Sequence, residues 1–67
     1  MHKDFLNQIK ECRMNQELSL KELSEKADIS YNYLLMLENG KKQNPTLNTL
    51  IKIAKALNVE ITFIYKN

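Results

Sequence analysis

The sequence predicts an all-α fold of several short helices. Apolar residues recur at helical spacing over about residues 5–12, 20–27 and 47–57. Residue types that start helices precede these segments, and an Asn-Gly pair that can stop a helix occurs once between them. We expect residues 1–67 to form one domain, because so short a chain can hold only one. At this length, folding buries only about 60% of the surface of the unfolded chain, so stability is marginal. Compact helix packing or oligomerisation must supply the remaining stability.

Composition excludes several functional classes. Ten Lys and Arg residues against eight Asp and Glu give a net charge of +2, which by itself does not indicate a nucleic-acid partner. One Cys and one His form no nucleophile–base set and no ligand cluster. We therefore expect no enzyme, no catalytic residue, no metal and no cofactor. Without a signal peptide or a long apolar run, the expected location is the cytoplasm, with no membrane contact.

The first helix is expected from an N-cap at Asp4 to about Met14. Its apolar face consists of Phe5, Leu6, Ile9 and Cys12. Cys12 is interpreted as a buried small hydrophobe in preference to a reactive thiol.

A second helix is expected to start at Ser19. Glu22 follows three residues later, which is the spacing of a capping box. One apolar face is formed by Leu20, Leu23 and Ala27. The pattern then breaks at residues 28–30.

A third helix follows the break at once. Ser30 can cap it, and Asn39-Gly40 can end it. Ile29, Leu34 and Leu37 are expected to face inward. Two helices joined by a turn of about four residues describe the helix-turn-helix that places its second helix in the major groove of DNA. Many helical hairpins bind nothing, so the pattern alone leaves DNA binding and a purely structural role open.

The chain resembles the Cro/lambda-repressor-like family of helix-turn-helix regulators, also called the XRE family, over about residues 5–65. The matching residues are Ile9, Arg13, Leu18-Ser19, Glu22-Leu23-Ser24, Lys26-Ala27, Ile29-Ser30, Tyr33-Leu34, Leu37-Glu38, Gly40-Lys41, Asn44-Pro45-Thr46-Leu47, Leu50, Ile53-Ala54, Ala56-Leu57 and Val59. The resemblance implies a compact five-helix lambda-repressor-like domain with the helix-turn-helix at helices two and three, about residues 19–39. It also implies an ion pair between Arg13 and Glu38.

The family's base-reading positions fall on Tyr31, Asn32 and Met36. Asn32 can bond adenine N6 and N7, whereas Met36 can offer only apolar contact to thymine methyl groups. Tyr31 can stack on a sugar, touch a thymine methyl or reach a phosphate. The positions suited to the DNA backbone are Ser19, Lys21, Ser30, Tyr33, Asn39, Lys41 and Lys42.

Three residues depart from the family pattern. Leu20 stands where Gln is common, so the usual side-chain bond to phosphate is lost. Glu17 and Asp28 stand where Gly is usual. Asp28 can adopt a left-handed backbone at a cost of ~1 kcal/mol, and Asn15 is an alternative left-handed residue near Glu17.

A fourth helix is expected from a Thr46 cap to Leu57, with Asn58 as a left-handed stop. Its core stripe consists of Leu47, Leu50, Ile53, Ala54 and Leu57, and Lys52 and Lys55 are interpreted as its solvated face.

Residues 59–65 fit two structures. Val59, Ile61, Phe63 and Tyr65 alternate as in a strand, whereas the family usually has a short fifth helix here. A helix would leave Phe63 exposed, which suggests an interface. We expect a homodimer through Ile61, Phe63, Ile64 and Tyr65, with two reading helices about 34 Å apart on a palindromic site.

Two functions remain open from the sequence. The first is a sequence-specific, double-stranded DNA-binding transcriptional regulator, a small dimeric repressor or autoregulator. Lys41-Lys42, Asn32 and the intact motif favour it. The alternative is a protein-interaction module, an antitoxin-like or repressor-antagonist subunit. Its protein partner would contact the apolar residues Tyr31, Leu35, Met36 and Phe63.

Overall fold

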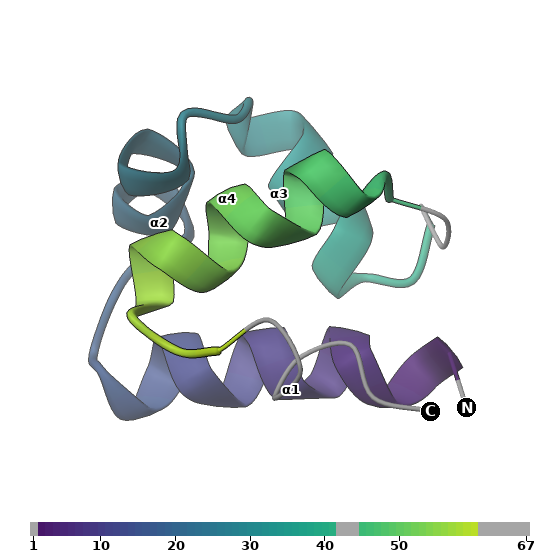
Figure 1. Ribbon diagram of the computed structural model, residues 1–67, viewed down its shortest axis with the longest axis horizontal. Helices are drawn as coiled ribbons and strands as arrows, with labels where there is room; N and C mark the ends of the chain where they lie inside the picture. Colours follow the sequence, from purple (N-terminus) through teal and green to yellow (C-terminus); the bar gives the residue numbers. More distant parts are fainter. Residues whose placement is uncertain (1, 42–44, 61–67) are drawn as a thin grey trace.

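The computed structural model describes the backbone of residues 2–41 and 45–60, and the side chains from residue 7 onward within these ranges. This part of the chain holds four helices, α1 (His2–Asn15), α2 (Leu20–Ala27), α3 (Tyr31–Glu38) and α4 (Leu47–Leu57) (Figure 1). It holds no strand, so the predicted all-α class is confirmed. Residues 59 and 60 are not helical, and the rest of the expected fifth element lies outside the described residues.

Helix α1 begins earlier than predicted and ends within one residue of the predicted Met14. It starts at His2, so a cap at Asp4 is wrong. Asp4 lies inside the first turn of the helix. Asn15 is the last helical residue, and Glu17 takes the left-handed backbone with φ 58°. The Leu18 amide donates to the Arg13 carbonyl at 3.0 Å, which is the bond that closes a Schellman motif.

Helix α2 begins and ends as predicted. The Ser19 hydroxyl accepts from the Glu22 amide at 3.0 Å, and the Ser19 amide donates to Glu22 Oε1 at 2.8 Å. Asp28 ends the helix in the left-handed conformation, with φ 58° and ψ 47°. The next amide, that of Ile29, donates back to the Ser24 carbonyl at 3.0 Å. These contacts confirm the capping box and the turn.

Helices α3 and α4 also begin and end at the capping residues that the sequence predicts. The Ser30 hydroxyl accepts from the Tyr33 amide at 2.9 Å, and Gly40 follows α3 with φ 78°. Thr46 caps α4 by accepting from the Thr49 amide at 3.1 Å, and Asn58 ends it with φ 60°.

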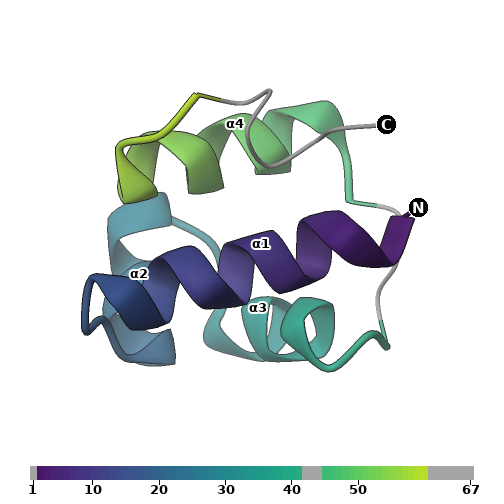
Figure 2. The ribbon, with the colours of Figure 1, turned by 90° about the horizontal axis from the view of Figure 1, so that it is seen from below.

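The four helices enclose one apolar cluster. Helix α1 runs between α3 and α4 when the molecule is seen from below (Figure 2). Helix α2 packs against the same two helices. The buried apolar side chains are Ile9, Leu23, Ala27, Leu34, Leu37, Leu50, Ile53, Ala54 and Leu57. All four helices contribute to this cluster, which therefore holds α2 and α3 in a fixed relation.

Burial differs from the prediction at Leu47 and Lys52 and agrees with it at Lys55 and Cys12. Leu47 is 60% exposed, so its assignment to the core is wrong. It follows the Thr46 cap directly, and the α4 stripe reaches the cluster only one turn later, at Leu50. Lys55 is exposed, whereas Lys52 is half-buried. Cys12 is half-buried and packs against the cluster, as its position on the apolar face of the first helix predicts.

None of the four described helices is both long and apolar enough to cross a membrane.

Candidate nucleic-acid interface

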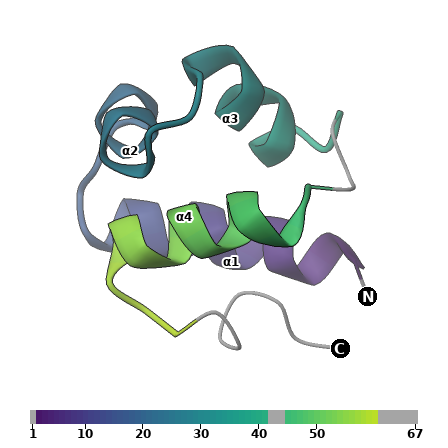
Figure 3. The same ribbon diagram turned by 45° about the horizontal axis from the view of Figure 1, so that its top comes forward.

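Helices α2 and α3 form a compact pair on one side of the molecule. Figure 3 shows them following each other through a short turn, with α1 and α4 on the other side. The turn is residues 28–30, and both of its ends are fixed by hydrogen bonds. At one end Asp28 closes α2, and at the other Ser30 caps α3. Only these three residues separate the helices, so α3 has little freedom to move relative to α2.

The predicted base-reading residues share the outward face of α3. Tyr31 is 47% exposed, Asn32 is exposed, and Met36 is half-buried. Leu34 and Leu37, on the opposite face, are fully buried. The spacing of the three residues, i, i+1 and i+5, keeps them on one side of an α-helix. The fold therefore brings these three side chains together on a surface that a groove of DNA could reach.

The described residues assigned to the DNA backbone come from the start of α2, from α3 and from its two ends. Lys21 on α2 and Lys41 beyond α3 are both exposed, as is Asn39 at the end of α3. The exposed hydroxyls of Ser19 and Ser30 accept at the helix caps, which leaves each O–H group able to donate. Tyr33 is half-buried and packs against the apolar cluster. Lys42 lies outside the described residues, as do the predicted interface residues Ile61, Phe63, Ile64 and Tyr65.

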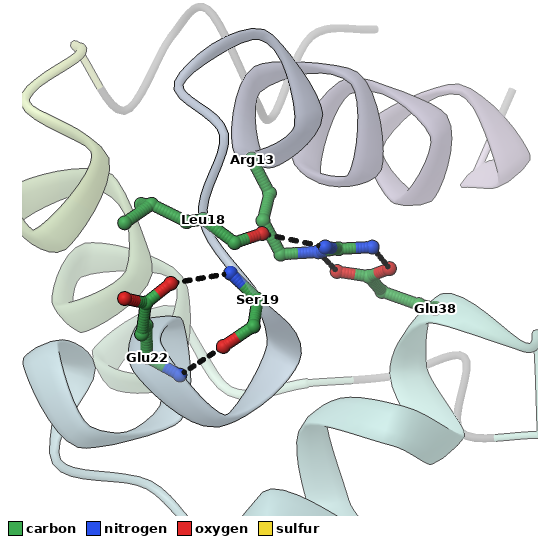
Figure 4. Close-up of polar contacts among 5 residues, drawn as sticks. All are labelled: Arg13, Leu18, Ser19, Glu22 and Glu38. Atoms are coloured by element: carbon green, nitrogen blue, oxygen red, sulfur yellow. Dashed lines mark hydrogen bonds and ion pairs between the residues drawn. The ribbon is translucent and has the colours of Figure 1, made fainter.

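Arg13 joins α1 to both ends of the helix pair (Figure 4). Its Nε donates to Glu38 Oε2 at 2.8 Å and its Nη2 donates to Glu38 Oε1 at 3.0 Å. Its Nη1 donates to the Leu18 carbonyl at 2.8 Å, immediately before the α2 cap. The hydrogen bond to Glu38 raises the pKa of Arg13, against the opposing effect of burial. The ion pair implied by the family resemblance is therefore present, and it holds the last residue of α3 near the start of α2.

Leu20 turns inward. It is half-buried and packs against the apolar cluster, so the residue that replaces the family's Gln supports the core. The exposed residue beside it, Lys21, is the cation of α2 nearest to its N-terminus.

A surface hollow between α2 and the start of α3 contains Ser24 and Glu25, which are not among the predicted site residues. It is lined by Lys21, Ser24, Glu25 and Tyr31. Ser24 is buried and its hydroxyl donates to the Lys21 carbonyl at 2.8 Å. Glu25 follows Lys21 by four residues, and this i, i+4 spacing is the signal that places both on one helix face. The hollow thus combines one cation, one carboxylate and an aromatic ring.

Metal-ligating side chains do not gather in the part of the chain that the structure describes, where no three His, Cys, Asp or Glu residues could hold one ion. Burial raises the pKa of the Cys12 thiol, and the charge of Glu11 raises it further. Both effects favour the neutral thiol.

The sequence matches known regulators. Residues 9–64 match the helix-turn-helix family. The chain is 36% identical over 53 residues to the HTH-type transcriptional regulator SinR of Bacillus subtilis, and equally to that of Bacillus licheniformis. Each alignment covers 79% of this chain and 48% of the relative. The chain thus spans about half the length of these curated relatives.

Solved structures agree with these matches. The N-terminal DNA binding domain of SinR from Bacillus subtilis superposes with a TM-score of 0.87 at 31% identity, covering 100% of this chain and 97% of that one. The structure of SinR in complex with DNA superposes with a TM-score of 0.85 at 32% identity, covering 90% of this chain and 98% of that one. The restriction-modification controller protein C.AhdI from Aeromonas hydrophila gives 0.87 at 26% identity, covering 92% of each chain. Its matched sequence, its capped helix pair and these superpositions show that the chain belongs to the helix-turn-helix family, as a domain of the Cro/lambda-repressor-like type.

Proposed function

We propose that this chain is a sequence-specific, double-stranded DNA-binding transcriptional regulator that places α3 in the major groove. The main support for the proposal is the outward face of α3, where Tyr31, Asn32 and Met36 lie together. The last residue of this helix, Glu38, is anchored to α1 by its ion pair with Arg13. The likeness to SinR in complex with DNA supports the same orientation. A helix held this firmly loses little conformational freedom on binding, which favours specific contact.

Base recognition is assigned to three side chains. The Asn32 amide can bond adenine N6 and N7 together, which distinguishes A·T from the other pairs in the major groove. Tyr31 and Met36 contribute contacts to sugar, phosphate or thymine methyl groups. These roles favour half-sites that contain A·T pairs.

The DNA backbone is assigned to residues that flank α3. The N-terminus of α2, with Ser19 and Lys21, can face a phosphate through free amides, a hydroxyl and an ammonium group. Ser30 and Tyr33 serve the start of α3, and Asn39, Lys41 and Lys42 serve its end. These contacts set the register of α3 on the duplex, whereas the base contacts supply sequence preference.

The regulator is further proposed to act as a homodimer, as a repressor or autoregulator in the cytoplasm. Residues 1–67 would form one domain, in which residues 59–65 are an interface segment that presents Ile61, Phe63, Ile64 and Tyr65 to a second copy. The large apolar residues concentrated in that segment support its assignment as an interface. Two copies related by a two-fold axis would place their reading helices about 34 Å apart on a palindromic site.

One observation favours a second function. Leu35 and Met36 are half-exposed, and apolar groups on an exposed helix face suit a protein partner as well as a DNA groove. An antitoxin-like or repressor-antagonist subunit would use this surface, and its complex would depend little on salt concentration.

Selection of bound sequences from a random pool of duplex DNA separates the two functions. For a DNA-binding regulator we expect a palindrome with A·T pairs, and Asn32→Ala should relax the preference at one position in each half-site. Asn48→Ala is the matched control, because Asn48 is an exposed asparagine on α4. If wild type enriches no sequence even at low salt, the DNA-binding function is wrong and the protein-interaction function takes its place.

A further inference from the structure

The outward face of α3 carries no free charge. It is formed by Tyr31, Asn32, Leu35, Met36 and Asn39, at positions i, i+1, i+4, i+5 and i+8. The one charged residue of α3 is Glu38, whose side chain is 5% exposed and engaged by Arg13. The nearest cations in sequence within the described ranges are Lys41, beyond the helix end, and Lys26, in α2.

This composition restricts the bases that α3 can recognise. Guanine is read chiefly by paired hydrogen bonds from Arg or Lys, and cytosine by a carboxylate that accepts from its amino group. The outward face of α3 offers neither. Its asparagines can read adenine. Leu35 and Met36 can make only apolar contact, and the ring of Tyr31 can add to it; the 5-methyl group of thymine is the apolar partner in the major groove.

Among the described side chains, the apolar part of this face is distinct from the apolar cluster. Leu35 and Met36 are half-buried, yet neither belongs to the half-buried side chains that pack against the apolar cluster. Tyr31 is 47% exposed on the same face. Single exposed apolar residues are ordinary on a protein surface, but three neighbours on one helix face indicate a contact surface.

We propose that α3 reads its DNA mainly through the 5-methyl groups of thymine, which Tyr31, Leu35 and Met36 contact while Asn32 binds adenine. The proposal rests on the DNA-binding function proposed above and specifies the chemical group that this site recognises. Removing one buried methyl group should weaken binding about fourfold, as expected for the transfer of a single carbon into an apolar contact.

Uracil tests this directly, because it lacks only the methyl group of thymine and keeps every hydrogen-bonding atom. Each thymine of the selected site is replaced in turn by uracil, and the Kd is measured for the wild-type chain. We expect about fourfold weaker binding at one or more positions of each half-site. At the position that Met36 contacts, Met36→Ala should show no further loss on uracil substitution. Met14→Ala is the matched control and should keep the full loss, because Met14 is an exposed methionine on α1.

A second arm adds the methyl group back on a different base. At a sensitive position the A·T pair is changed to G·C, with cytosine in the place of thymine, and binding is compared with cytosine and with 5-methylcytosine. Methylation should recover about fourfold in affinity. Equal affinity for thymine and uracil throughout the site would overturn the proposal while leaving DNA binding intact. Failure to bind any DNA sequence would overturn the DNA-binding function itself, so the two failures are distinguishable.

Discussion

The guanidinium of Arg13 binds both carboxylate oxygens of Glu38, at 2.8 Å and 3.0 Å. The two residues are 25 positions apart in the sequence, and their side chains are only 13% and 5% exposed. A third bond from the same guanidinium reaches the Leu18 carbonyl. One side chain of α1 thus binds both the segment that leads into α2 and the last residue of α3, and so holds the two helices in a fixed relative position.

Replacing Arg13 with Ala should lower the free energy of unfolding by about 2–4 kcal/mol, because Glu38 is left buried without its partner. Urea denaturation measures this directly. Lys10→Ala removes an exposed cation from the same helix and should change stability by less than about 0.5 kcal/mol. If Arg13→Ala unfolds like wild type while its DNA affinity is lost, Arg13 contacts DNA and does not stabilise the arrangement of α2 and α3.

Glycine at the two left-handed positions should stabilise the fold. Glu17 and Asp28 both have φ of 58°, a conformation that costs most side chains about 1–2 kcal/mol. Because glycine also gains freedom in the unfolded chain, Glu17→Gly and Asp28→Gly should each raise stability by a net of about 0.5–1 kcal/mol. Glu25→Gly lies within helix α2 and should instead cost about 1 kcal/mol. A lower melting temperature for Glu17→Gly would contradict the assigned turn.

Two leucines of α4 should respond very differently to truncation. Leu50 is 2% exposed within the apolar cluster, so Leu50→Ala should cost about 2–5 kcal/mol. Leu47 is 60% exposed one turn earlier, so Leu47→Ala should change stability by about 0.5 kcal/mol or less. Thermal melts of the two variants, with α4 otherwise identical, give the comparison. Equal losses would mean that the first turn of α4 is buried against something in solution.

The Cys12 thiol should make stability fall at alkaline pH. Its pKa is raised in the folded chain, by burial first and by Glu11 second, so the unfolded chain loses this proton at lower pH. The contribution to stability is therefore complete below the pKa of the unfolded thiol, and it is lost as pH rises toward and through the folded pKa. Urea denaturation across that alkaline range should show a decline that Cys12→Ala reduces. An identical decline in the variant would assign the effect to other groups.

Lys41 should contribute to the salt dependence of DNA binding. If it neutralises one phosphate, Lys41→Ala should reduce the magnitude of the slope of log K against log salt by about 0.9. Titrations over a range of salt concentrations measure the slope. Lys55→Ala is the matched control, because Lys55 is an exposed lysine near the end of α4. Equal slopes for wild type and Lys41→Ala would remove Lys41 from the backbone contacts.

The helix boundaries followed from the sequence wherever the deciding hydrogen bond was local. Ser19, Ser30 and Thr46 each bind an amide three residues ahead, and these caps are as predicted. Asp28 and Asn58 are left-handed as predicted. Such bonds depend only on residue type and on a few neighbouring residues, so they can be recognised without a fold.

The family resemblance predicted contacts that local sequence patterns could not. It implied the contact between Arg13 and Glu38, which no helical periodicity relates. It also assigned Tyr31, Asn32 and Met36 to one reading face, and the structure brings them to one side of α3. Their individual contacts to DNA stay predictions until they are measured.

Tertiary structure alone decided which apolar residues are covered and where irregular backbone falls. Leu47 and Leu50 share one apolar stripe in the sequence, yet only Leu50 reaches the cluster, because burial depends on where the other helices end. The left-handed residue after α1 is Glu17 and not Asn15, since α1 continues to Asn15 before the chain turns toward α2. The sequence by itself determined the start and end signals of the helices. Packing decided the rest, because exposure is a property of neighbours that lie far apart along the chain.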